Sequence, residues 1–203
     1  MDIGRAAVER DDAAEDTELP LLMEFVNTSD IEGGVDEIGT PELLSAWLAT
    51  QAGEETFGPM LVDRDTHRRA IDIREGLRAL GRSNNGEPGD AERVAALNRA
   101  SESLRVSISL APDAWDLAPA GRGADAVLGR ILSILVKAMA DGRWSRVKAC
   151  RNDTCQFLFV DRSRNRSATW CSMAICGSRM KARSYRARRR GEAETSRGAS
   201  ATR

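Results

Sequence analysis

Four cysteines within a short C-terminal stretch constrain the fold of this chain more than any other feature. Residues 150–176 read CRNDTCQFLFVDRSRNRSATWCSMAIC and contain every cysteine of the 203-residue sequence. They form two pairs with the same C-x4-C spacing, Cys150 with Cys155 and Cys171 with Cys176. Each pair can hold one edge of a tetrahedral Zn2+ ion, and four thiolates leave no open coordination position. The spacing therefore predicts one structural zinc ion with these four ligands.

Two disulfides, or free thiols, are the alternative interpretation of the same cysteines. The first eighteen residues are acidic and lack the apolar run of a secretory signal. The best apolar run, ILSILV at 131–136, is much shorter than a membrane span. We therefore expect a cytoplasmic protein, and in the cytoplasm paired cysteines bind metal more often than they form disulfides.

The charge of the chain is divided between its two parts. Residues 1–142 hold 14 Lys and Arg against 27 Asp and Glu, a net charge of −13. Residues 143–203 hold 16 against 4, a net charge of +12, and 14 of the 16 cations are arginines. This asymmetry favours a polyanionic partner for the basic part, because arginine suits phosphates and guanine edges. A solvated basic tail is the alternative.

The sequence predicts an α+β fold in which a mainly helical N-terminal domain, residues 19–142, carries a small β-hairpin. Residues 1–18 have little to bury and are expected to form a disordered acidic leader. Helix signals begin at Thr40-Pro41, at Asp63 or Asp65, and at Asp90. The second of these helices should run to about residue 80 and be followed by a loop at 81–89.

Three further segments complete the predicted domain. Residues 22–26 favour a helix, with a short strand as the competing interpretation. Residues 104–110 alternate strictly between apolar and polar and predict a half-buried strand, with a return strand after the turn at 111–113. Residues 124–142 are apolar nearly all round and predict a helix at the centre of the core.

A second candidate site lies near the start of this domain. Glu24, Asn27 and Thr28 are polar residues within an apolar segment and could line a small-molecule pocket, although such residues more often cap a helix end. His67 is the only histidine, and the sequence contains no motif of a known catalytic site. We expect the chain not to be an enzyme.

The cysteine module is predicted over residues 143–190, with a disordered tail at 191–203. Residues 156–160 should form a strand, residues 161–167 a turn, and residues 168–170 the return strand, with Phe157, Phe159 and Trp170 as a small core. In the turn, Asp161 can accept backbone hydrogen bonds and Asn165 can take a left-handed conformation. A basic helix should follow Cys176.

The basic residues of this module are the predicted contacts to nucleic acid: Arg162, Arg164 and Arg166 in the turn, and Arg179, Lys181, Arg183, Arg186 and Arg190 in the helix. Four of the helical arginines, at 179, 183, 186 and 190, share one face. A polyanion would relieve their mutual repulsion. A metal-stiffened hairpin followed by a basic helix therefore predicts binding to double-stranded DNA.

The cysteine spacing, together with FLFVDRSRNRSATWCSMAICGSRMKARSYRAR at 157–188, resembles the CGNR zinc-finger family. That module follows an N-terminal ABATE domain in bacterial proteins described as stress-induced transcription regulators, and LPLLMEFVNT at 19–28 is similar to the opening of that domain. The resemblance implies zinc ligation by the four cysteines and a role in DNA binding. This chain departs from the family at Ser178, where the family has asparagine. Any cap or DNA contact of that asparagine is therefore altered, although serine can still cap a helix.

The leading hypothesis is a DNA-binding transcription regulator whose N-terminal domain senses a small-molecule effector or forms a homodimer. The alternative is a zinc-dependent module that binds protein or RNA. Because the two parts of the chain have opposite charge, we also expect the acidic part to shield the basic module.

Overall fold

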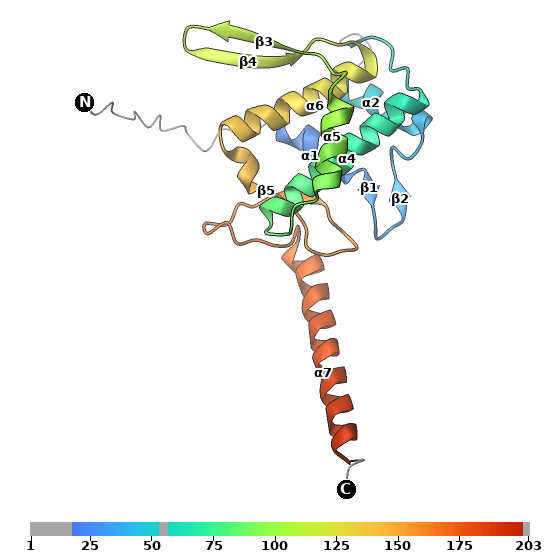
Figure 1. Cartoon of the computed structure of the whole chain (residues 1–203), viewed down its shortest axis with the longest axis vertical. Helices are drawn as coiled ribbons and strands as arrows, with labels where there is room; N and C mark the ends of the chain where they lie inside the picture. The colour runs from blue at the N-terminus through green and yellow to red at the C-terminus, as the bar shows by residue number, and fades with distance from the viewer. Residues whose placement is uncertain (1–17, 53–56, 201–203) are drawn as a thin grey trace, which may run out of the picture.

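A computed structural model describes residues 18–52 and 57–200 of the chain (Figure 1). Side chains are described at these residues except Ala52 and residues 190–200. The predicted acidic leader lies, apart from residue 18, outside the described part. Among the described residues, no helix combines the length and hydrophobicity needed to cross a bilayer.

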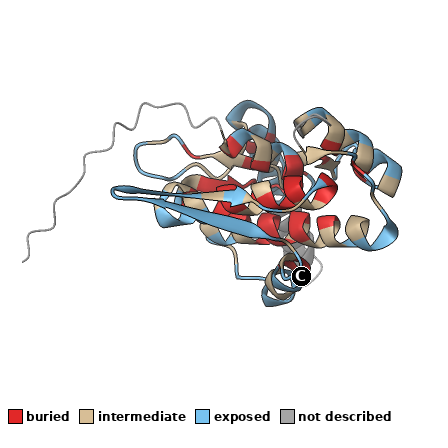
Figure 2. Cartoon of the chain, turned by 90° about the horizontal axis from the view of Figure 1, so that it is seen from above, coloured by how far each residue is buried: buried red, intermediate tan, exposed pale blue. Residues whose placement is uncertain are grey.

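The N-terminal part is a helical body. Its helices are α1 (Leu19–Asn27), α2 (Pro41–Ala52), α4 (Arg64–Asn84), α5 (Ala91–Ser101) and α6 (Gly123–Ala140). Helix α6 packs against α1, α2 and α4, which confirms its predicted place in the core. Buried residues concentrate where these helices meet (Figure 2), and Leu22, Phe25, Ile73, Leu77, Leu128 and Ile131 are fully buried.

The helix starts confirm the capping signals. The Asp63 carboxylate accepts a hydrogen bond from the Thr66 N–H at 2.7 Å, and the Asp90 carboxylate accepts one from the Arg93 N–H at 3.0 Å. Helix α1 confirms the helical interpretation of residues 22–26. Two short strands that the sequence did not indicate, β1 (Ser29–Asp30) and β2 (Val35–Asp36), pair antiparallel after α1.

Helix α4 is longer than predicted, because it continues to Asn84 through the expected loop at 81–89. Gly81, which was expected to begin the loop, instead lies inside the helix at a close packing contact. A Cβ on Gly81 would lie 2.4 Å from Leu158 Cδ2 and 3.3 Å from the backbone nitrogen of Ala149. Glycine therefore lets the C-terminal module approach the end of α4 closely.

The predicted hairpin is present, but it is not half-buried. Strands β3 (Val106–Ala111) and β4 (Ala114–Pro119) pair antiparallel, with Leu110 opposite Trp115. Every residue of β3 is exposed, including Ile108 at 68% and Leu110 at 81%. The hairpin projects from the body beside α6, so that most of its apolar face meets no other described element (Figures 1 and 2).

The C-terminal part begins with a 3-10 turn, η1 (Arg143–Arg146), and continues with β5 (Val147–Ala149), β6 (Leu158–Val160), a π-helical turn η2 (Met173–Gly177) and α7 (Ser178–Ser200). The predicted strand at 156–160 is present as β6, but the predicted return strand at 168–170 is wrong. The partner of β6 is β5, with Val147 opposite Val160.

The reason for the different pairing is burial. All three residues of β5 are buried, and Val147 and Ala149 belong to the same core as α4 and α6. The carbonyl of Ala168, in the expected return strand, instead accepts a hydrogen bond from the Lys148 ammonium. Helix α7 extends away from the body, and it runs to Ser200, past residue 190, with no proline to interrupt it (Figure 1).

Candidate zinc centre and basic helix

The first cysteine pair lies on a tight turn that connects β5 and β6. The Asn152 carbonyl accepts hydrogen bonds from the backbone N–H groups of Cys155 at 2.8 Å and Gln156 at 3.1 Å. The Cys150 N–H donates to the Phe157 carbonyl at 2.9 Å, and Gln156 has a left-handed φ of 55°. This turn holds the two sulfur atoms on the same side of the chain.

In the second pair, Cys171 lies just before η2 and Cys176 lies within it. Ser172 caps this turn, since its hydroxyl accepts a hydrogen bond from the Ile175 N–H at 3.3 Å. Gly177 closes it, because a Cβ there would lie 2.5 Å from Met173 Sδ and 3.1 Å from the ring of Trp170. The predicted small core forms around these turns, with Phe157, Phe159 and Trp170 packed against the cysteines.

The four sulfur atoms are arranged as zinc ligands. All lie within 4.8 Å of one another, with 3.6 Å between Cys155 and Cys171 and 3.7 Å between Cys171 and Cys176. Zinc–sulfur bonds of about 2.3 Å in a tetrahedron place the sulfur atoms about 3.8 Å apart. A disulfide needs about 2.0 Å. The four cysteines are thus free thiols here, and their arrangement fits one structural zinc ion better than two disulfides.

Electrostatics lead to the same conclusion. Hydrogen bonds, first from the Cys155 thiol and then from the backbone N–H groups of Cys171 and Asn152, lower the pKa of Cys150 to about 5 despite burial. The hydrogen bond with Cys150, aided by burial, raises the pKa of Cys155. Without a metal ion, the protein therefore favours a thiolate at Cys150 beside a protonated thiol at Cys155. A dication is what allows all four sulfurs to ionise.

Family comparisons agree with this geometry. Residues 146–189 match the CGNR zinc finger, and residues 19–142 match ABATE, described as "Putative stress-induced transcription regulator". The chain belongs to the ABATE family. We find no match among curated proteins. Below, the two matched segments are called the ABATE region and the zinc finger.

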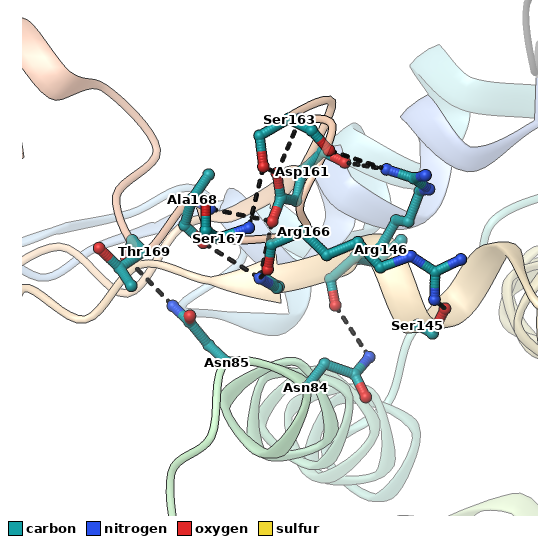
Figure 3. Close-up of polar contacts among 12 residues, drawn as sticks. Asn84, Asn85, Ser145, Arg146, Asp161, Ser163, Arg166, Ser167, Ala168 and Thr169 are labelled. Atoms are coloured by element: carbon teal, nitrogen blue, oxygen red, sulfur yellow. Dashed lines mark hydrogen bonds and ion pairs between the residues drawn. The ribbon is translucent and has the colours of Figure 1, made fainter.

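The ABATE region and the zinc finger share one hydrophobic core. Trp144, Val147, Ala149 and Leu158 are buried in the same cluster as the helices of the ABATE region. Two asparagines at the end of α4 bind the backbone that leads into the finger (Figure 3). Asn84 Nδ2 donates to the carbonyls of Trp144 and Val147, and Asn85 Nδ2 donates to those of Ala149 and Thr169.

The three residues predicted to line a pocket do not converge on one cavity. Glu24 is exposed on α1. Asn27 points to the zinc finger, where its amide hydrogen bonds the backbone of Leu158. Thr28 is buried, and its hydroxyl donates to the Phe25 carbonyl at 2.8 Å. Thr28 thus stabilises the C-terminal end of α1, and Asn27 attaches α1 to the finger.

A buried ion pair organises the turn after β6 (Figure 3). Lys148 Nζ lies 2.7 Å from Asp161 Oδ2 and donates to the carbonyl of Arg166 at 2.6 Å. Asp161 also accepts from the backbone N–H groups of Ser163 and Ala168, as predicted. The left-handed residue of the turn is Arg166, with a φ of 51°, rather than Asn165.

The predicted nucleic-acid contacts lie on two exposed surfaces. Arg162, Arg164 and Arg166 are exposed in the turn, and Arg179, Lys181, Arg183 and Arg186 are exposed on α7, whereas the Arg190 side chain lies outside the described part. One of them has a partner in the ABATE region, since Arg179 forms an ion pair with Glu32 in the β1–β2 connection. Ser178 does not cap α7; its hydroxyl donates to the Met173 carbonyl at 3.3 Å and closes η2.

Sequence reasoning missed the polar residues that hold the zinc finger in place. Asn152 supports the zinc centre twice, through its carbonyl and through Nδ2, which lies 3.7 Å from Cys176 Sγ. Lys148, Arg151, Asn84 and Asn85 also hold the finger in place. The sequence signal for Asn84 and Asn85 was their position in a Gly- and Asn-rich stretch, which indicated a loop instead.

Proposed function

We propose that the chain is a transcription regulator that binds double-stranded DNA through its zinc finger and α7. The observation that supports this most is the shape and charge of α7. Residues 179–190 contain seven Lys and Arg, and every described side chain from 181 to 189 is exposed. An α-helix fits the major groove of B-DNA, and arginine can contact both phosphates and guanine edges.

The zinc centre supports the proposal because it fixes the start of α7. Cys176 lies in η2, directly before α7, and Gly177 packs against Trp170 and Met173. A metal ion that holds Cys176 therefore sets the direction in which the basic helix leaves the body. The exposed arginines of the turn would add contacts to phosphates beside the groove.

A mobility-shift titration of duplex DNA against salt tests the proposal. We expect affinity to fall steeply as salt rises, because arginine–phosphate contacts release counterions. Arg183→Gln should weaken binding and reduce the salt slope by about one unit. Arg64→Gln, at an exposed position at the start of α4, is the matched control and should change neither. Absence of binding to any duplex at low salt would refute the proposal.

RNA binding is the second candidate, and one observation favours it. Tyr185 is 54% exposed on α7, with the Arg189 guanidinium 6.0 Å from its ring centre. Such a ring can stack on an unpaired base. Phe157 and Phe159 pack against the cysteine cluster instead. A preference for single-stranded RNA that Tyr185→Ala removes would favour this candidate over duplex DNA.

We also propose that the regulator forms a homodimer through the β3–β4 hairpin. By strand alternation, Val106, Ile108, Leu110, Trp115 and Leu117 share one face, which carries no charge. Exposed apolar surface of this kind marks an interaction site, and an uncharged face fits a second identical hairpin. In sedimentation, Leu110→Glu should yield monomers, whereas Ser109→Glu on the opposite face should not. A wild-type chain that is monomeric at high concentration would contradict the dimer.

We further propose that the protein is cytoplasmic, is induced by stress and has no enzymatic activity. The position of the only histidine supports the last of these. His67 Nε2 lies 2.8 Å from the Ile38 carbonyl, which gives the ring a structural role in holding the segment before α2.

A further inference from the structure

A polar, half-open hollow with a volume of about 490 Å³ lies between α4, the start of α5 and the zinc finger. Arginines from two helices line it, together with Gln156, the residue that follows the zinc ligand Cys155. This volume is in the range of sites that hold a small metabolite. Neither the four cysteines nor any residue of α7 lines the hollow, although Arg78 lies close enough to Cys155 to interact with it electrostatically.

Arg78 is the central observation. Its side chain is 5% exposed and lines the hollow. One nitrogen donates to the Val26 carbonyl at 2.7 Å, but Nε is buried without a hydrogen-bond partner among the described residues. Its nearest carboxylate, Glu75, lies 3.6 Å away and is held closer by Arg74, at 2.9 Å. Among the described residues, Arg78 therefore has no carboxylate within hydrogen-bond distance, and its Nε has no partner.

Two further arginines and a helix start lie around the same hollow. Within the described part of the chain, Arg82 pairs with Glu87 alone, at 3.0 Å. Arg93 has no ion pair with any residue that the structure describes, and it projects from the first turn of α5. The N-terminal end of a helix favours negative charge. The nearby acids are engaged, since Asp90 caps α5 and Glu75 pairs with Arg74.

We infer that this hollow is a binding site for a small anion that carries a carboxylate or a phosphate, held by Arg78, Arg82 and Arg93. The anion would give the Arg78 guanidinium an anionic partner closer than Glu75. Because Gln156 also lines the hollow, the bound anion would touch both the ABATE region and the turn that holds Cys150 and Cys155. The site goes beyond the proposed function and does not depend on DNA binding.

Calorimetric titration of the zinc-loaded full chain, without DNA, tests the site. The probes are inorganic phosphate and citrate, each at an ionic strength matched with sodium chloride. We expect saturable binding of at least one probe, weakened about tenfold by Arg93→Gln or Arg82→Gln, as expected for a lost charge-assisted hydrogen bond. Arg99→Gln is the matched control, because Arg99 is exposed on α5 and does not line the hollow.

Amide hydrogen exchange places the bound probe. Phosphate or citrate should slow exchange in peptides that contain residues 82–93 and Gln156. Absence of saturable binding by both probes, equal affinity in Arg93→Gln and Arg99→Gln, or protection confined to other peptides would each overturn the inference. If neither probe binds but Arg93→Gln lowers affinity for duplex DNA, the arginines serve the nucleic acid and the small-anion site is likewise refuted.

Discussion

The side-chain amide of Asn27 forms two hydrogen bonds with the backbone of Leu158. Asn27 Oδ1 accepts from the Leu158 N–H at 2.7 Å, and Nδ2 donates to the Leu158 carbonyl at 3.1 Å. The amide thereby pairs with β6 as a neighbouring strand would. It joins the end of α1 to the zinc finger across 131 positions of sequence. The ABATE region and the finger are thus held by specific polar contacts as well as by a common core.

Asn27→Ala should destabilise the whole chain by about 2–3 kcal/mol, because it leaves two partly buried backbone groups without partners. Urea unfolding of the zinc-loaded protein measures the change. Glu24→Ala, at an exposed position of the same helix, is the control and should stay within about 0.5 kcal/mol of wild type. Equal effects of the two substitutions would show that the contact contributes nothing.

The parts of the structure that depend on neighbouring residues could be predicted from the sequence. The C-x4-C spacing determines which thiols can share a metal, and Asp63 and Asp90 sit where helix caps belong. The apolar pattern of α6 indicated that this helix packs in the core, although Val136 and Met139, which belong to the same pattern, are exposed.

The parts that depend on distant residues could not be predicted. Asn84 and Val147 are 63 positions apart, so nothing near Asn84 indicates that its amide binds a backbone carbonyl of the finger. The pairing of β5 with β6 follows from burial of Val147 and Ala149 against α4, and not from the turn at 161–167. The exposure of β3 is the opposite case, in which alternation predicts a strand correctly but says nothing of what covers it.

Zinc removal should unfold more than the finger. Since Ala149 and Leu158 flank the cysteine turn and lie in the main core, we expect one cooperative thermal transition at a lower temperature after chelation. Elemental analysis should find one zinc ion per chain, and Cys155→Ser should lose it. Returning Zn2+ to the wild type should restore the original transition. Two separate transitions, with the ABATE region unaffected by chelation, would contradict this coupling.

The buried Lys148–Asp161 pair should make stability depend on pH. Burial by itself raises the pKa of Asp161. Hydrogen bonds from Lys148 and Ser163, together with the positive charge of Lys148, outweigh the effect of burial and hold this pKa well below its usual range. A depressed pKa means that the carboxylate stabilises the fold fully above about pH 4, its unfolded value, and loses this effect as the pH falls further. The difference in unfolding free energy between wild type and Asp161→Asn should therefore narrow below about pH 4.

Removing Lys148, the partner of the Asp161 carboxylate, should lower the unfolding free energy more than Asp161→Asn does. Lys148→Met leaves Asp161 buried without a cation, and we expect a loss of about 3–5 kcal/mol at neutral pH. Urea unfolding measures it, with zinc content checked in parallel. The double variant Lys148→Met, Asp161→Asn should recover part of the loss, because it no longer buries an unpaired charge. Additive losses in the double variant would show that the two residues act independently.

The ion pair between Glu32 and Arg179 should restrain the basic helix. Both side chains are about half exposed, so the pair adds little to stability, and Glu32→Gln should leave the unfolding free energy within about 0.5 kcal/mol of wild type. The same substitution frees Arg179 for a phosphate and removes a negative charge beside α7. If DNA binding is confirmed, affinity for duplex DNA at low salt should rise about two- to fivefold. Glu37→Gln changes the net charge equally, at an exposed acid that has no ion pair within the described residues, and should raise affinity less. Equal affinities of the two variants would show that the acidic ABATE region acts only through its total charge.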